Sequence, residues 1–290
     1  MQAEDSPHNT DVVTVTGLFS YPVKGCRAIA RATASVLTTG LANDREWMVV
    51  DARSSPAQFI TQRQCAAMAT LCVDVNDDGS LLLFTDSGDA LHVDPPSRTA
   101  LIKVKVWNHE TIALDAGDVV ARWLAAQLRL SHPVRLVRFN HEMRRECNRL
   151  YAGDSVAHTY FADGYPLLVT NMASLAELNR RIGDIASKAL PMNRFRPNLV
   201  IDGLPAWDED HVDTVTIGEA TLKLAKPCVR CEVTTADQAT GLRLSEEPLN
   251  TLARFRNNPD FGGVTFGWNA VVLTPGTISV GDQVCVAYRF

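Results

Sequence analysis

Short runs in which apolar and polar residues alternate recur along most of the chain, and this period of two is typical of half-buried β-strands. The clearest runs are VVTVTGL at residues 12–18 and LIKVKVW at residues 101–107. The segment NDDG at residues 76–79 predicts a tight turn between strands at 71–75 and 81–84. The sequence therefore predicts a fold built mainly from strands.

Helical spacing of apolar residues is clear in two segments, residues 115–128 and 174–182, and Asn171 or Ser174 is the expected cap of the second. The polar segment 141–163 is expected to be a long irregular connection near a domain junction. Further strands are expected at residues 46–50, 134–139, 198–202, 214–217, 221–224, 232–235, 270–273 and 283–288, with turns at 276–277 and 281–282.

The chain has 290 residues, of which 46% are hydrophobic and 21% are charged, and this composition is ordinary for a soluble globular protein. The length favours two domains, which we expect at residues 12–135 and 136–290. The net charge of −5 argues against a general nucleic-acid binder, because such proteins carry a basic excess on some face.

No apolar run approaches the ~20 residues that a membrane-spanning helix needs. The first eleven residues, MQAEDSPHNTD, have neither the basic and apolar regions of a secretory signal nor the arginines of a transit peptide. We therefore expect a cytoplasmic protein, and the prior removal of a membrane or mitochondrial targeting segment stays open.

Seven cysteines are spread thinly along the chain, which does not resemble a secreted disulfide framework and favours a reducing compartment. Most of them stand among apolar residues, as Cys72 and Cys285 do, and are expected to be small core residues. Cys228 and Cys231 alone form a close pair, in the segment KPCVRCEVTT.

A C-x-x-C pair has three common uses. A zinc site needs two further ligands, and no second pair stands at a suitable spacing. A thioredoxin-like pair normally opens a helix, whereas this pair is followed by the expected strand at 232–235. The third use is a single thiolate ligand for a soft metal, with Lys226 and Arg230 stabilising the thiolate. On spacing alone, two buried core cysteines remain the first alternative.

Several cationic side chains stand next to predicted strands. Lys24 and Gly25 follow the first strand, Arg45 stands just before the second, and Arg196 just before the strand at 198–202. Guanidinium and ammonium groups beside a glycine suit a phosphate. Taken singly, each is as well explained by a surface or ion-paired residue, so none of these signals is specific alone.

Together these segments closely resemble the MOSC family, which contains the mitochondrial amidoxime reducing component and its bacterial relatives. The matching segments occur in the family's order and cover nearly the whole chain, which makes the set far more specific than any one motif. They are YPVKGCR (21–27), NDREW (43–47), FADGYPLLV (161–169), ASLAELN (173–179), FRPNLVIDG (195–203), KPCVRCEVTTAD (226–237), FGWNAVV (266–272) and PGTISVGD (275–282).

The resemblance implies a β-rich α+β fold, with an N-terminal MOSC-type β-barrel domain followed by the C-terminal MOSC β-barrel domain and a few helices. It implies a molybdenum cofactor, Mo-molybdopterin, bound between the two, with Cys231 as the metal ligand and catalytic residue. The cofactor-binding residues that it implies are Lys24, Gly25, Arg45, Gly164, Tyr165, Arg196, Asn198, Val229, Arg230 and Asn269.

The sequence departs from the family pattern at three of these positions. Gly25 and Val229 stand where relatives often have serine, so that only backbone contacts remain there, and Tyr165 replaces a small polar residue. Some bacterial relatives continue into a ferredoxin-like domain, and the sequence ends at Phe290 without that cysteine cluster, so we expect a stand-alone member. Asp237 is expected to form a turn, with orientation of the metal site as the alternative.

The function that the resemblance implies is molybdenum-dependent reduction of small N-hydroxylated compounds such as amidoximes, hydroxylamines and N-hydroxylated bases. The alternatives are a carrier or sulfur-handling MOSC protein, and a thiol redox protein that uses Cys228 and Cys231 without metal. The absence of a pyridoxal-phosphate domain from the sequence favours the reductase over the sulfur transferase.

A reductase must also receive electrons. The sequence has no nucleotide-binding glycine pattern, no ferredoxin-type cysteine cluster and no haem-ligand pattern. We therefore expect a separate donor, of the cytochrome b5 type or the ferredoxin/flavodoxin type, with its own NAD(P)H reductase. Arg144, Arg145 and Arg149 are a candidate docking patch, and a solvated loop is the alternative.

Overall fold

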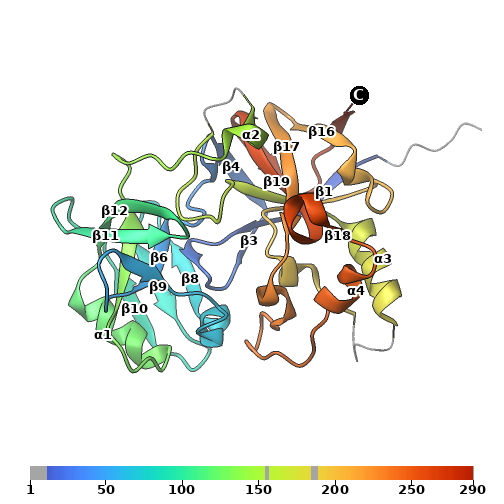
Figure 1. Ribbon diagram of the computed structural model, residues 1–290. Helices are drawn as coiled ribbons and strands as arrows, with labels where there is room; N and C mark the ends of the chain where they lie inside the picture. Colours follow the sequence, from blue (N-terminus) through green and yellow to red (C-terminus); the bar gives the residue numbers. More distant parts are fainter. Residues whose placement is uncertain (1–11, 154–156, 184–188, 290) are drawn as a thin grey trace, which may run out of the picture.

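The computed structural model describes residues 12–153, 157–183 and 189–289. Strands dominate these ranges, and four α-helices accompany them. Two β-barrel units lie side by side in Figure 1, with most of the blue to green part of the chain in one and the yellow to red part in the other. The expected β-rich fold with two barrel units and a few helices is confirmed.

The first barrel has five strands, β6 (Trp47–Asp51), β7 (Ala57–Phe59), β11 (Leu101–Val106), β12 (His109–Asp115) and β13 (Val134–Phe139). It closes because β13 pairs with both β12 and β6. Met48 and Val50 belong to one core cluster, while Trp47 and Val49 belong to another on the opposite side of the strand. Burial on both faces explains why β6 reads as an apolar run.

The outer core of this unit lies between the barrel, helix α1 and a small sheet. Helix α1 (Asp118–Gln127) buries Val120 and Leu124 there. The sheet consists of β8 (Cys72–Val75), β9 (Leu81–Phe84) and β10 (Ala90–Val93). The predicted turn at residues 76–79 joins β8 to β9, as the hairpin signal indicated.

The second barrel is a larger sheet with the strand order β21-β16-β17-β19-β14-β15-β1-β3. Backbone hydrogen bonds join residues 13–15, at the start of its first strand in the sequence, to residues 281–284, which lead into its last strand. The sheet therefore curls back on itself. The strands are β1 (Thr14–Ser20), β3 (Ile29–Arg31), β14 (Leu167–Asn171), β15 (Leu199–Asp202), β16 (Val212–Ile217), β17 (Ala220–Val229), β19 (Gly263–Thr274) and β21 (Val284–Tyr288), with β18 (Asn257–Asn258) beside β19.

The start of the chain completes the second barrel before the chain builds the first. Strand β1 pairs with β15, and β4 (Thr33–Leu37) pairs with β20 (Gly276–Ser279) and β5 (Gly40–Leu41). Between β1 and β3 the chain crosses to the first barrel through β2 (Val23–Lys24), which pairs with β6, and it enters that barrel fully only after β5. The boundary between residues 135 and 136 stays a proposal, and the crossing brings residues from both halves of the sequence to one junction.

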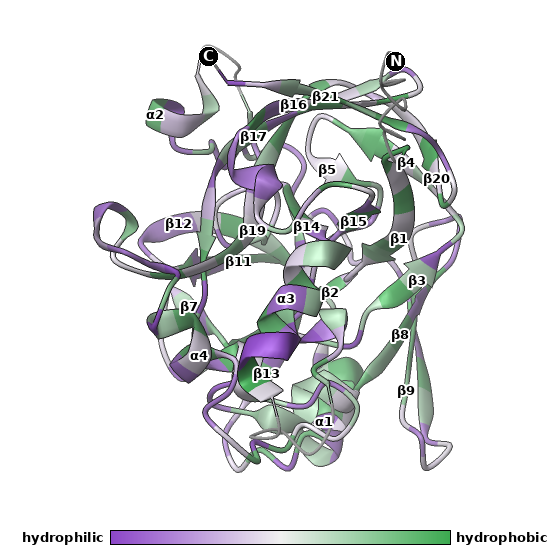
Figure 2. Ribbon diagram, turned by 90° about the vertical axis from the view of Figure 1, so that its right-hand side faces the viewer, coloured by the Kyte–Doolittle hydropathy of each residue, from purple (hydrophilic) through white to green (hydrophobic). Residues whose placement is uncertain are grey.

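The remaining helices cover the second barrel or its connections. Helix α3 (Met172–Ile182) lies against β14 and β15, and Figure 2 shows it in front of these strands. The other two are the short helices α2 (Arg149–Ala152) and α4 (Leu249–Ala253). Within the described ranges, no helix is long and apolar enough to cross a membrane.

Three local predictions were wrong. Residues 232–235 form a 3-10 helix, η5 (Glu232–Thr235), because the Thr234 and Thr235 hydroxyls donate to backbone carbonyls three residues earlier, at 2.9 and 2.8 Å. Residues 276–277 begin strand β20 and do not form a turn; Gly276 is small because the Ala220 backbone would lie 2.8 Å from a Cβ there. Cys285 is exposed, because the alternation of β21 puts it on the outer face.

The cap of α3 is the buried Asn171. Its side-chain oxygen accepts from the Ala173 amide at 3.1 Å, and its Nδ2 donates to the buried Glu209 carboxylate at 3.0 Å. Ser174 does not cap the helix; its hydroxyl donates to the same carboxylate at 2.8 Å. Burial raises the pKa of Glu209, and these two donors partly offset that effect.

We expect Asn171→Ala to lower the free energy of unfolding by about 2–4 kcal/mol, since it removes a cap and one donor to a buried carboxylate. The matched control is Asn148→Ala, because Asn148 makes the same cap for α2 at an exposed position and should cost at most about 1 kcal/mol. Urea unfolding monitored by circular dichroism measures both. Equal losses in the two variants would contradict the assigned role of the Asn171–Glu209 bond.

Candidate functional site

A cavity lies at the junction of the two barrels and is lined by residues from both. All eleven residues that the sequence analysis nominated for the site line it: Lys24, Gly25, Arg45, Gly164, Tyr165, Arg196, Asn198, Val229, Arg230, Cys231 and Asn269. They come from segments that are up to 245 positions apart, between Lys24 and Asn269. Their individual roles remain predictions, and their gathering in one cavity is a property of the structure.

Two arginines form the floor of the site around a buried tyrosine. The guanidinium carbons of Arg45 and Arg196 each lie 4.3 Å from the centroid of the Tyr21 ring. The Tyr21 hydroxyl donates to the Pro197 carbonyl at 3.0 Å, which ties the N-terminal segment to the second barrel. Burial raises the pKa of Tyr21 to about 12, so the ring between the two cations stays neutral at physiological pH.

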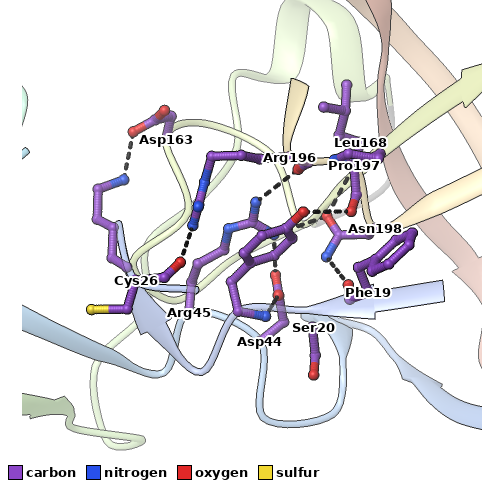
Figure 3. Close-up of polar contacts among 12 residues, drawn as sticks. Phe19, Ser20, Cys26, Asp44, Arg45, Asp163, Leu168, Arg196, Pro197 and Asn198 are labelled. Atoms are coloured by element: carbon purple, nitrogen blue, oxygen red, sulfur yellow. Dashed lines mark hydrogen bonds and ion pairs between the residues drawn. The ribbon is translucent and has the colours of Figure 1, made fainter. Parts of the chain in front are cut away.

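Both arginines are held in place by further bonds. Arg45 donates to the buried Asp44 carboxylate at 2.6 Å and to the Asn198 side-chain oxygen at 2.9 Å, as Figure 3 shows. Arg196 donates to the Gln238 side-chain oxygen at 3.0 Å and to the Cys26 carbonyl at 2.8 Å. The guanidinium groups are therefore fixed before any ligand arrives.

The backbone at both arginines is unusual. Arg45 has φ 49° and Arg196 has φ 53°, a left-handed conformation that is uncommon for residues other than glycine. Such residues persist only where the surroundings hold them, and they cluster at functional sites. Gly25 has φ 85°, and a Cβ there would lie 2.9 Å from Met68 Cε, so a serine at this position would be strained and crowded.

The cavity is strongly cationic in a chain with a net charge of −5. Among the described residues that line it, five side chains carry positive charge and Asp163 is the one carboxylate: the cations are Lys24, Arg45, Arg63, Arg196 and Arg230. Burial lowers the pKa of Lys24 and of Arg196, because desolvation disfavours their charged forms. A bound anion would offset that cost, so the site favours an anionic ligand.

Asp163 partly balances this charge. Its Oδ1 accepts from Lys24 Nζ at 2.5 Å and from the Trp107 indole at 2.9 Å. Desolvation within the cavity opposes ionisation of Asp163, but the Lys24 ammonium outweighs it and holds the pKa of the carboxyl below its usual range. The carboxylate is thus an anion at neutral pH, and its side chain is 72% exposed to the cavity and solvent.

Arg145 supports the segment that carries Asp163. It is 6% exposed and donates to the backbone carbonyls of Tyr160, Ala162 and Asp163 at 2.9, 2.5 and 2.6 Å. It therefore cannot belong to an exposed docking patch, so its place in the suggested patch was wrong, whereas Arg144 and Arg149 are exposed and their role there stays a prediction. This charged residue of a polar segment is buried because three carbonyl groups accept hydrogen bonds from its two terminal nitrogens.

The two cysteines of the C-x-x-C pair have different surroundings. Cys231 is exposed and immediately precedes η5, whereas Cys228 is half-buried near the end of strand β17. Arg230 donates to Cys228 Sγ at 2.8 Å and to the Phe195 carbonyl at 2.7 Å. Lys226 Nζ lies over the rings of Tyr151 and Phe261 at 4.8 and 5.3 Å, and its expected contribution to the thiolate stays a prediction.

One further prediction about this region has a clear outcome. Asp237 forms the expected turn, since its Oδ1 accepts from the Ala239 and Thr240 amides at 2.9 and 3.0 Å. Within the described ranges, no three histidine, cysteine or acidic side chains gather closely enough to hold a metal ion. A metal bound at Cys231 would therefore need its other ligands from a cofactor or solvent.

The sequence analysis missed several residues of the cavity wall. Asp163 stands directly before Gly164 in a segment that had been singled out, so its carboxylate was a usable signal. Trp107 closes the alternating run at 101–107 but lies in the turn after β11, and Arg63 also lies in a turn; nothing in the local pattern points to a cavity at either. The nominated Asn198 lines the cavity, but its amide is already engaged with Arg45, Leu168 and Phe19.

Comparison with known proteins identifies both halves of the chain. The model of the MOSC N-terminal beta barrel domain matches residues 12–131, and the model of the MOSC domain matches residues 157–285. The chain is 34% identical to human mitochondrial amidoxime-reducing component 1 over 289 residues, which is 94% of this chain and 82% of that protein. It is 31% identical to rat mitochondrial amidoxime reducing component 2, over 94% of this chain and 83% of the relative.

Among solved structures, the YuaD protein of Bacillus subtilis aligns over 96% of this chain and 97% of its own, with 9% identity and a TM-score of 0.41. A likeness of this size supports no conclusion about the site.

The cysteines should differ in reactivity in protein prepared without cofactor. We expect iodoacetamide at pH 8 to alkylate the exposed Cys231 and Cys285 first and the half-buried Cys228 more slowly. Burial raises the pKa of Cys26 to about 12 and that of Cys147 to about 11, so these thiols stay protonated and unreactive until the chain unfolds. Peptide mass spectrometry measures the order of alkylation. If Cys231 reacted only after unfolding, the site would have no accessible thiol.

Proposed function

The chain belongs to the family of MOSC-domain proteins that includes the mitochondrial amidoxime-reducing components, and from that premise we propose that it binds a molybdenum cofactor and reduces small N-hydroxylated compounds. The observation that carries the proposal is the exposed thiol of Cys231 in the wall of a cavity lined by five cationic side chains. A thiolate suits a soft metal, and the cations suit the phosphate of a pterin cofactor.

The residues present fit such a group. Arg45 and Arg196 offer fixed guanidinium groups, and Lys24 adds a point charge. Two buried polar atoms beside the cavity, Arg230 Nε and the Tyr165 hydroxyl, have no hydrogen-bond partner among the described residues. A Cβ at Gly164 would meet nothing within 4 Å, so the backbone there leaves room for a ligand.

In this proposal Cys231 holds the metal, and Val229, Arg230, Asn198 and Asn269 line the cofactor. The cofactor, when bound, supplies two electrons for cleavage of the substrate N–O bond, with two protons taken up and the oxygen released as water. The protein binds and orients the cofactor and the substrate. Its arginines need no rearrangement on binding, which is the condition under which fixed charges are most effective.

We further propose that the electrons come from a separate protein, of the cytochrome b5 type or the ferredoxin/flavodoxin type, with its own NAD(P)H reductase. The support is the absence of a nucleotide-binding glycine pattern, a ferredoxin-type cysteine cluster and a haem-ligand pattern in the sequence. Electron-transfer contacts are usually small and weak.

The test of the proposed function is a pair of cysteine variants. Holoprotein with reduced methyl viologen and benzamidoxime should form benzamidine, whereas NADH without a partner protein should support no turnover. We expect Cys231→Ser to retain less than about a tenth of the molybdenum and activity, since even outer partners of metal ligands contribute 10–100-fold in affinity. Cys228→Ser should retain most of its molybdenum.

The other outcomes separate the alternatives. Full molybdenum and activity in Cys231→Ser would show that Cys231 is not the ligand, and zinc in the wild-type protein would favour a zinc site. Molybdenum with no reduction of several N-hydroxylated compounds would favour a cofactor carrier. Turnover that needs both cysteines and no metal would favour a thiol redox protein.

A second prediction concerns the anion-binding arginines. We expect the double variant Arg45→Ala, Arg196→Ala to lose most of its cofactor, since each charged hydrogen bond contributes about 1.5–3 kcal/mol. Molybdenum and phosphate per protein measure the occupancy, and circular dichroism checks the fold. The control is Arg122→Ala, at an exposed position of α1. Unchanged occupancy in the double variant would contradict the anion-binding role.

A further inference from the structure

One wall of the cavity is an exposed aromatic ring that the described residues hold in a fixed orientation. Trp107 lies in the turn between β11 and β12, with φ 54°, and is 44% exposed. Its indole nitrogen donates to Asp163 Oδ1 at 2.9 Å, and its ring packs edge-to-face on Phe59 with the centroids 5.0 Å apart. Because one edge of the indole is hydrogen-bonded to Asp163 and another part of it packs on Phe59, the ring presents a rigid apolar surface to the cavity.

The anchor of this tryptophan is itself fixed. Asp163 accepts from Lys24 on the same oxygen, at 2.5 Å, and its backbone carbonyl accepts from the buried Arg145 at 2.6 Å. Lys24 Nζ also lies 5.0 Å from the centroid of the Phe59 ring, on which Trp107 packs. The orientation of Trp107 is therefore tied to the residues that form the cationic floor of the site.

Arg63 differs from the other arginines that line the cavity. Its guanidinium carbon lies 5.3 Å from the centroid of the Trp107 ring, and the residue is exposed. Within the described ranges no oxygen accepts a hydrogen bond from it, whereas Arg45, Arg196 and Arg230 each have such acceptors. Arg63 thus keeps its donors available at the aromatic wall.

We propose that Trp107 and Arg63 determine substrate specificity in this site. Trp107 stacks on a planar, conjugated N-hydroxylated substrate, and Arg63 binds an anionic group, such as a carboxylate, that the substrate carries beyond its ring. The proposal rests on the proposed function and specifies its preferred substrates: aromatic amidoximes with an acidic substituent over neutral aliphatic ones. Aromatic pairing and a guanidinium–carboxylate bond are the interactions that separate these classes.

The test compares three substrates with reduced methyl viologen as the electron source: benzamidoxime, its para-carboxylated derivative and acetamidoxime. We expect Trp107→Leu to raise the KM for both aromatic substrates about five-fold relative to that for acetamidoxime. Trp107→Phe, which keeps a ring, should show a smaller change and guards against misfolding. Arg63→Gln should raise the KM for the carboxylated substrate up to about five-fold relative to that for benzamidoxime, and Arg122→Gln is the matched control.

Several results would overturn the proposal. Equal changes in KM or kcat for all three substrates would show a merely structural role. If Arg63→Gln lowered only the rate with a protein electron donor, Arg63 would belong to a donor-docking surface. Calorimetry of the carboxylated benzamidoxime binding to the oxidised holoprotein separates this proposal from the proposed function. If the wild-type protein reduces nothing, the proposed function fails, and unchanged affinity in both variants would overturn the specificity proposal as well.

Discussion

The junction of the two barrels depends on two guanidinium groups that lie against one buried tyrosine ring. Arg45, from the first half of the chain, donates to the Asn198 side chain and the Arg196 carbonyl in the second half. Arg196 donates back to the Cys26 carbonyl. Asp44 is the carboxylate bonded to Arg45, and Arg196 is bonded only to neutral oxygens, so the junction is held together by bonds that also concentrate positive charge. The cavity inherits that charge, and an anion there would relieve repulsion between groups that the fold keeps close.

Much of the fold could be predicted from the sequence, because most strands are amphipathic or fully buried. The strands at 81–84 and 134–139 have the predicted bounds, and α1 begins three residues inside the predicted segment and ends one residue before its end. Some errors arose where contacts between distant segments determine the local structure. Strand β20 forms because β4, about 240 positions earlier, pairs with it, and no local pattern at Gly276 can show that. At η5 local side-chain bonds overrode the strand propensity of valine and threonine.

The candidate site was predictable to a different degree. Its nominated residues were found through the family resemblance, and the crossing of the chain between the barrels explains why such distant segments meet. Trp107 and Arg63 were missed because both lie in turns, and the alternating run that Trp107 closes gives no sign of a cavity. Arg145 was misread for a physical reason: sequence polarity predicts exposure, yet a guanidinium can be buried when carbonyl oxygens accept its donors.

The arginines around the cavity fall into two kinds, and the difference fits the two ligands of the proposed function, a cofactor and a substrate. Arg45 and Arg196 have acceptors within the protein and a fixed orientation, which suits a ligand that is the same in every catalytic cycle. Arg63 rests on an aromatic ring without an acceptor among the described residues, so its donors stay available to a ligand. Under the proposed function, fixing the first kind lowers the entropy cost of binding the cofactor, whereas the second kind keeps its donors available for the anionic group of a substrate. In the proposed holoprotein, Cys231 would be bound to the cofactor and Trp107 would face the substrate.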